Sequence, residues 1–170
     1  TEEPIMSCDI LNFQDKYLDS RGLQSCRRVI PADISDEYFD EIKNDARFNL
    51  FDINVVGHSW GGFSTLNISA LHDEVKKVVV ISGFVSVELL VNDFYSGLLK
   101  GYRKAIMKLE NESNPYFVRF NVIDSLKKSN ADVLLIYSDN DTLCKKETHY
   151  DILYNELKDK TNIKFMLVND

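Results

Sequence analysis

A serine between glycines is the feature of the sequence that most directly suggests chemistry. The hexapeptide GHSWGG, residues 57–62, follows a β-branched run and precedes a helical pattern. This spacing suits a tight strand-to-helix turn that lifts the hydroxyl above the sheet, at the positive end of the next helix. Ser59 could then attack a carbonyl carbon, with the Trp60 backbone N–H as an oxyanion donor. The alternative is a glycine-rich turn that serves packing alone.

The elements that would position Ser59 alternate along the chain. From about Cys26 onward, strand-like and helix-like stretches follow one another, which is typical of a parallel sheet with crossover helices. Apolar runs predict strands at Ile53–Val56, Lys77–Ser82, Asp132–Tyr137 and Ile163–Val168. Helical spacing predicts helices at Ser35–Phe48, Phe63–Leu71 and Lys146–Lys158. We therefore expect an α/β fold with a mostly parallel sheet and flanking helices.

A long insert without strand pattern separates the second and third of these strands. Its apolar residues lie mostly at helical spacing, which predicts a small helical cap over residues 84–130 within a single domain, residues 1–170. Its large side chains could line an apolar substrate pocket, but the core of the cap is the more common use of such residues. They are Phe94, Tyr95, Tyr102, Met107, Tyr116 and Phe117.

The motif VVGHSWGG, residues 55–62, resembles the nucleophile elbow of the α/β-hydrolase superfamily. The resemblance covers about residues 26–170 and implies that fold. The segment YSDNDTL, residues 137–143, follows a predicted strand as the acid loop of this family does. The resemblance thus implies that Asp141 is the triad acid, with Asp139 as the alternative. The same residues could form only a turn, because Asp and Asn side chains bond their own backbone.

The histidine of such a triad has no counterpart in the expected place. The family order is serine, acid and then histidine just beyond the last strand, but here the sequence stops two residues after Val168. A serine hydroxyl is a weak nucleophile without a base. His58 flanks the elbow, and His72 follows the next predicted helix. His149, near Asp141 in the sequence, is the remaining candidate base, although a packing or solvated histidine is the more common case. We therefore expect the base beyond Asp170.

The front of the sequence is also shorter than the family pattern. The resemblance implies three further strands and an oxyanion loop before the elements found here. Leu11–Gly22 would match the helix that precedes the fourth strand of the family, and Cys26–Ile30 would match that strand. We expect that the sequence belongs to a longer protein. A shortened, inactive relative is the alternative.

Composition excludes several classes of function. A length of 170 residues suits one domain, and a net charge of −7 disfavours nucleic-acid binding. No apolar run reaches the roughly 20 residues that span a bilayer. No metal-ligand spacing or phosphate loop is present, so we expect neither a metal nor a cofactor. The three cysteines suit a reducing compartment slightly better, which favours a cytoplasmic location.

Together these features predict a serine hydrolase. It would cleave a small carboxylic ester, thioester or amide through an acyl-enzyme on Ser59. One alternative is a binding protein of the same fold in which the elbow is not catalytic. Another is an acyltransferase that uses the same nucleophile with an acceptor other than water. In the catalytic cases the expected partner is a small-molecule acyl substrate.

Overall fold

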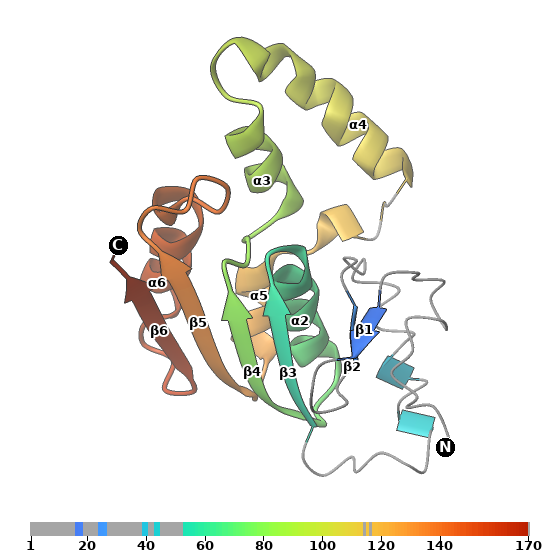
Figure 1. The fold of residues 1–170 in the computed structure, drawn as a ribbon, viewed down its shortest axis with the longest axis vertical. Coiled ribbons are helices and arrows are strands. Elements are labelled where there is room, and N and C mark those ends of the chain that lie inside the picture. Colours follow the sequence, from blue (N-terminus) through green and yellow to red (C-terminus); the bar gives the residue numbers. More distant parts are fainter. Residues whose placement is uncertain are drawn as a thin grey trace.

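Four parallel strands form the main sheet of the protein in a computed structural model, which describes residues 16–18, 24–26, 39–40, 43–44, 53–113, 115 and 117–169. The strands are β3 (Ile53–His58), β4 (Val75–Ile81), β5 (Asp132–Ser138) and β6 (Ile163–Val168). They lie in the order β3-β4-β5-β6 (Figure 1), and each neighbouring pair is parallel. The carboxyl ends of all four strands therefore meet at one edge.

One face of this sheet carries the core. Val78, Val133 and Ile163 are register partners on β4, β5 and β6, and all three are buried. Successive side chains of a strand point to opposite faces, so the intervening positions share the other face. There Val56 is 71% exposed and Met166 is 49% exposed. The apolar side chains are therefore buried on one face and largely exposed on the other.

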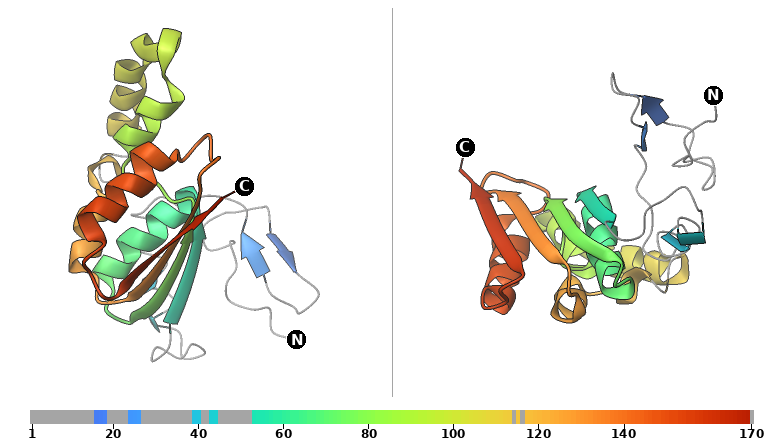
Figure 2. Two further views of the ribbon diagram at one scale, coloured as in Figure 1. Left: turned by 90° about the vertical axis from the view of Figure 1, so that its left-hand side faces the viewer. Right: turned by 90° about the horizontal axis from the view of Figure 1, so that it is seen from below.

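Three helices cover the buried face (Figure 2). They are α2 (Trp60–Leu71), α5 (Val122–Lys128) and α6 (Asp151–Leu157). Helix α2 packs on β3 and β4 and against α5, which in turn contacts α6. Each helix contributes fully buried side chains, namely Phe63, Leu66, Leu126, Leu153 and Leu157. This layer fixes where the amino end of α2, and with it Ser59, stands relative to the sheet.

The segment expected to form a cap is helical. It contains α3 (Val87–Phe94), the 3₁₀ helices η1 (Gly97–Tyr102) and η2 (Phe117–Arg119), and α4 (Arg103–Ser113). Helices α3 and α4 extend beyond the carboxyl ends of the strands (Figure 1). Helix α5 also lies within residues 84–130, but it packs on α2 and belongs to the layer that covers the sheet. The projecting part is therefore shorter than the predicted insert.

The four strands predicted between Ile53 and Val168 are present, with boundaries shifted by at most two residues. The helix predicted from Phe63 begins earlier, at Trp60, because the glycines of the motif form its first turn. The helix predicted over residues 146–158 divides into a π-helical turn, η3 (Lys146–Tyr150), and α6. Of the predicted helix Ser35–Phe48, residues 39–40 and 43–44 are helical, and the others lie outside the described residues.

The prediction of a helix over Leu11–Gly22 is wrong for residues 16–18. These residues form strand β1 (Lys16–Leu18), which pairs antiparallel with β2 (Gln24–Cys26). A glycine such as Gly22, between two short runs, is compatible in sequence with a helix cap and with a hairpin connection. The antiparallel pairing of Lys16–Leu18 with Gln24–Cys26 favours a strand over a helix for the first of these segments. The predicted strand Cys26–Ile30 lies outside the described residues except at Cys26, which ends β2.

Candidate active site

Ser59 joins β3 to α2 in a strained backbone conformation. Its φ of 53° and ψ of −116° lie in a region that residues with a Cβ rarely adopt. Its amide donates to the Ile81 carbonyl at 2.9 Å, and its carbonyl accepts from the Phe63 amide at 3.0 Å. Although Ser59 occupies the N-cap position of α2, its side chain makes no capping hydrogen bond. The sheet and the helix thus hold the turn, while the hydroxyl is not used to cap the helix.

Two glycines allow this turn to pack closely. A Cβ at Gly57 would lie 2.3 Å from the Gly61 carbonyl oxygen and 2.5 Å from Thr65 Oγ1. A Cβ at Gly62 would lie 2.8 Å from Val80 Cγ1. Gly61 has no atom within 4 Å of the corresponding position. Within the first turn of α2, close packing therefore requires a glycine at position 62 and not at position 61, although Gly61 is the glycine that the serine motif shares with its family.

The amino end of α2 is suited to bind developing negative charge. Trp60 is the first helical residue, and the amides of a first turn point outward at the positive end of the helix dipole. No acidic side chain occupies that turn. The Trp60 ring packs edge-on against Phe84, with the ring centroids 4.7 Å apart, and Phe84 stacks on Phe63 at 4.5 Å. These aromatic contacts fix the first turn beside Ser59.

Asp141 lies in the loop after β5, and its carboxylate is held by several donors. Its Oδ1 accepts from the amides of Leu143 at 2.8 Å and Cys144 at 2.9 Å. Partial burial alone would raise the pKa of this carboxyl group. The hydrogen bonds from the Ser82 hydroxyl and from these two amides, together with the charge of His149 when protonated, outweigh it and lower the pKa. Asp141 is therefore a carboxylate at neutral pH.

Backbone hydrogen bonds continue the sheet one residue past three of its strands. Besides the bond from Ser59 to Ile81, the Ser82 amide donates to the Ile136 carbonyl at 2.9 Å, and the Asp139 amide donates to the Val168 carbonyl at 3.1 Å. Strand β4 separates β3 from β5, so the ends that precede Ser59 and Asp141 lie two strand spacings, about 10 Å, apart. A side chain that hydrogen-bonds to both could span that gap. Asp139, the alternative acid, is exposed.

None of the three histidines is placed to act as the base for Ser59. His58 is exposed on β3, on the face of the sheet opposite the helices. His72 is buried at the end of α2, and its ring lies 4.1 Å from that of Phe39. His149 is fully buried, and its Nδ1 accepts a hydrogen bond from the Val85 amide at 3.2 Å. Because Nδ1 is already an acceptor there, His149 is poorly placed to take a proton from Ser59.

His149 instead connects η3 to α3. Its Nε2 lies 3.3 Å from Asp93 Oδ2, and the acceptor role of Nδ1 places the proton of the neutral ring on Nε2, facing that carboxylate. Thr148 donates to the same carboxylate oxygen, and Lys145 Nζ lies 3.6 Å from Oδ1. Burial lowers the pKa of His149 despite the nearby carboxylates of Asp93 and Asp141. We call Asp93, Lys145, Thr148 and His149 the α3 anchor.

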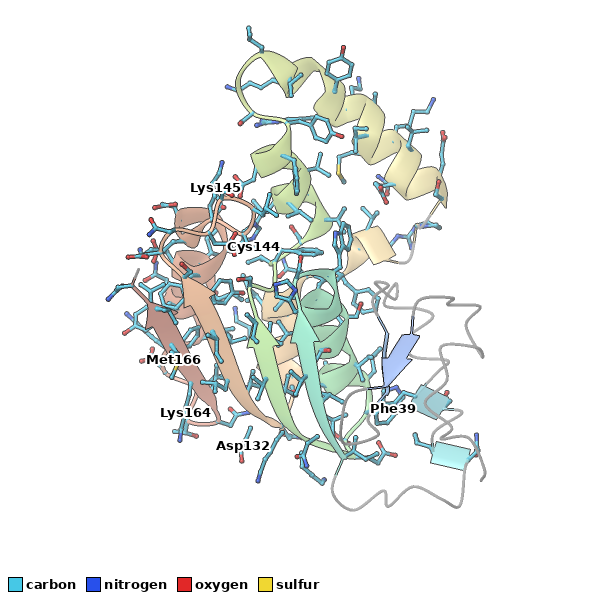
Figure 3. All side chains as sticks on the ribbon, viewed as in Figure 1. Phe39, Asp132, Cys144, Lys145, Lys164 and Met166 are labelled. Atoms are coloured by element: carbon cyan, nitrogen blue, oxygen red, sulfur yellow. The ribbon has the colours of Figure 1, made fainter. Side chains whose placement is uncertain are left out.

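Cys144 lies near this anchor, at the carboxyl edge of the sheet, and Figure 3 labels it together with Lys145. The thiol is buried, and burial together with the charges of Asp141 and Asp93 raises its pKa to about 12. A thiol nucleophile reacts as the thiolate. Cys144 therefore stays protonated at neutral pH and packs as a small apolar residue.

A shallow depression of about 340 Å³ lies at the opposite, amino edge of the sheet. Its lining includes Lys77, Asp132 and Lys164, the last two of which Figure 3 labels. This position separates it from Ser59 by the length of the strands. Among the described residues, no group of three or more His, Cys, Asp or Glu side chains could hold a metal ion. Within the same residues, no helix has the length and apolar character needed to cross a membrane.

The large side chains of the projecting segment divide into two groups. Tyr95 and Met107 are partly buried and pack against the core, as a cap interior requires. Phe94 and Tyr102 are 51% and 59% exposed, so they neither form a core nor line an enclosed pocket. The side chains of Tyr116 and Phe117 lie outside the described residues.

Comparisons with known proteins found no matching family model and no matching curated protein. Solved structures do match, however. An acetyl xylan esterase from a Thermoanaerobacterium species is similar over 80% of this chain and 43% of its own, with 23% identity and a TM-score of 0.52. An acetyl xylan esterase from a Paenibacillus species matches over 80% and 44%, with 20% identity and a TM-score of 0.60.

A third similar structure is an acylaminoacyl peptidase from Pyrococcus horikoshii. It covers 81% of this chain and 22% of its own, with 19% identity and a TM-score of 0.56. The chain thus spans less than half the length of each of these three proteins. At such low identity the likeness concerns the fold. The predicted α/β fold, with a parallel sheet and flanking helices as in these α/β-hydrolase structures, is confirmed.

Proposed function

We propose that the protein is a serine hydrolase that cleaves a carboxylic ester, thioester or amide through an acyl-enzyme on Ser59. One observation carries the proposal: Ser59 keeps a strained conformation at the β3–α2 junction, and its side chain does not cap the helix. Strain of this kind persists only where the surrounding structure enforces it, and it is common at functional sites. A serine required only for packing would need neither feature.

The proposed chemistry follows from the surroundings of Ser59. Its Oγ attacks the acyl carbon while a base takes the hydroxyl proton, and the carbonyl oxygen becomes an oxyanion. The Trp60 amide, at the amino end of α2, donates to that oxyanion. Collapse of the intermediate releases the alcohol, thiol or amine, which receives the proton from the base. Water then attacks the acyl-enzyme by the reverse sequence of steps and releases the acid.

The mechanism requires a base between Ser59 and Asp141. Asp141 is suited to orient an imidazole, because its carboxylate is ionised and fixed by three donors. The positions of His58, His72 and His149 do not suit this role. We propose that the base is a histidine outside these 170 residues, in the family position after β6. A binding protein without catalysis is the rival function, and the positions of these three histidines favour it.

Covalent labelling tests the proposal. In a protein that includes the proposed histidine after β6, a fluorophosphonate probe should raise the intact mass by one adduct, and peptide fragmentation should locate it on Ser59. Ser59→Ala should remove both the adduct and the hydrolysis of p-nitrophenyl acetate. Ser113→Ala, an exposed serine on α4, is the matched control and should keep both. A folded protein that takes up no adduct, or a Ser59→Ala variant that retains full activity, would overturn the proposal.

A further inference from the structure

The projecting helices expose apolar side chains at their far end. Five large apolar residues between positions 94 and 109 leave about half or more of their surface exposed, namely Phe94, Leu98, Leu99, Tyr102 and Leu109. We call residues 94–109 the cap tip. No residue of α4 is buried, and none of η1 is buried. An exposed apolar cluster of this kind marks a surface that meets another apolar phase.

The cap tip is also basic. It contains Lys100, Arg103, Lys104 and Lys108 and no acidic residue, whereas the whole chain has a net charge of −7. Lys100 and Lys104 are exposed. Lys108 lies 3.7 Å from Glu112, in a pair that is exposed on both sides. The segment that carries the exposed apolar side chains is thus basic, on a protein whose net charge is negative.

Arg103 has a different role, because it holds the cap tip together. Its Nε donates to the Tyr95 carbonyl at 2.7 Å, and its Nη2 donates to the Asn92 carbonyl at 2.6 Å. These bonds fasten the start of α4 to the carboxyl end of α3. The α3 anchor in turn fastens α3 to η3. The exposed side chains are therefore presented by a braced segment.

The cap tip lies on the same side of the protein as the carboxyl ends of the strands. Helices α3 and α4 project past the carboxyl ends of the strands, the edge that bears Ser59 and Asp141 (Figures 1 and 2). A flat partner that met the cap tip would therefore face this edge of the sheet. The depression at the amino edge would point away from it.

We propose that the cap tip docks on the surface of an anionic lipid bilayer. The apolar side chains enter the boundary between headgroups and acyl chains, and Lys100, Lys104 and Lys108 lie at the level of the anionic headgroups. A lipid surface meets both features of the cap tip, since it supplies an apolar phase and negative charge together. The net negative charge of the whole chain opposes other orientations on such a membrane. This inference does not depend on catalysis by Ser59.

Sedimentation with vesicles tests the proposal on the full chain. The protein should bind vesicles that contain phosphatidylglycerol and should bind those of phosphatidylcholine alone much more weakly. Because each lysine near an anionic surface contributes about fivefold, Lys100→Gln, Lys104→Gln and Lys108→Gln together should weaken binding about a hundredfold. Leu98→Ser should weaken it about tenfold, because the apolar contact is lost.

The matched control changes three lysines outside the cap tip. Lys77→Gln, Lys128→Gln and Lys158→Gln alter the net charge equally at exposed positions and should change binding less than twofold. Circular dichroism checks that every variant folds. Equal loss in both triple variants, or equal binding to both kinds of vesicle, would overturn the proposal. So would retardation of the protein by a polyglutamate peptide without vesicle binding, since the surface would then suit an acidic protein. Unchanged binding of Leu98→Ser would likewise contradict insertion.

Discussion

The β3–α2 turn and the cap tip are held in place in opposite ways. At the turn, Ser59 adopts an unfavourable backbone conformation that close contacts around Gly57 and Gly62 enforce. In the cap tip, Gly97 alone has a positive φ, and no side chain of α4 is fully buried, although Ile106 and Met107 are partly buried against the core. Packing determines the geometry of the first region. A few polar bonds brace the second.

This contrast shows where the chain can tolerate change. A strained turn needs neighbours that cannot move, so substitutions around it should affect stability and chemistry together. A surface segment has few neighbours to displace, so substitutions there should leave folding nearly unchanged and alter only what the surface meets.

The largest effect is expected in the layer behind the turn. Leu66 on α2 is fully buried, and Leu66→Ala should lower the free energy of unfolding by about 3 kcal/mol, since it removes apolar contacts and leaves a cavity. Leu109→Ala in the cap tip, where the leucine is 57% exposed, should change it by less than about 0.5 kcal/mol. Urea unfolding followed by circular dichroism measures both. Similar costs at the two positions would remove the distinction between the regions.

A smaller effect is expected within the motif itself. Gly57→Ala should cost about 2 kcal/mol, because its Cβ would meet the Gly61 carbonyl oxygen, a backbone atom that cannot move without distorting α2. Gly61→Ala places its Cβ in open space and should be neutral or stabilise α2 by up to about 1 kcal/mol. The same urea titrations compare the two variants. A tolerated alanine at position 57 would show that the turn is less constrained than the contacts indicate.

The smallest effect concerns the α3 anchor, which fastens α3 to η3. The lowered pKa of His149 means that the unfolded chain binds a proton more readily than the folded one. The contribution of His149 is therefore present above its unfolded pKa of about 6.5 and is lost as the pH falls toward its folded pKa. Burial lowers the pKa of His149 most strongly, and the charge of Lys145 lowers it further. The carboxylates of Asp93 and Asp141 raise this pKa and so reduce the shift.

His149→Asn tests this dependence, because an asparagine can still accept from the Val85 amide but does not titrate. The free energy of unfolding of the wild type should fall more steeply between pH 7 and 5.5 than that of the variant. The difference should be at most about 1.4 kcal/mol per pH unit. His58→Asn, at an exposed histidine, is the control and should follow the wild type. Parallel curves for His149→Asn and the wild type would contradict the buried neutral ring.

The sheet was predictable because its strands are marked locally. Four short, mainly apolar runs gave β3 to β6 within two residues, because such runs are typical of the strands of parallel sheets. The hairpin β1–β2 was not predictable, since three-residue strands carry almost no periodic signal and depend on pairing. The π-helical turn in η3 was also missed. No residue pattern in Lys146–Tyr150 separates it from an α-helix.

The candidate site was predictable in part for the same reason. Ser59, Trp60 and Asp141 lie in short segments with local signatures, and the structure places them after strands whose carboxyl ends meet at one edge. Contacts between distant segments were not predictable. The hydrogen bond from Ser82 to Asp141 joins loops 59 residues apart, and its only signal was a serine at the end of a predicted strand. The contact of His149 with Asp93 likewise joins α3 to η3.

The hydrogen bonds that continue the sheet past β3, β4 and β5 also set a tolerance for insertions and deletions. The amides of Ser59, Ser82 and Asp139 each donate to a carbonyl of the neighbouring strand. The positions of the three loops along the strand direction are therefore fixed relative to one another. One residue added within β4 would raise Ser82 by about 3.3 Å and reverse the faces of every later position in that strand. Two added residues would restore the faces but double the offset. The length of β4 therefore determines where Ser82 lies relative to Ser59 and Asp141, although β4 contributes no proposed reacting group.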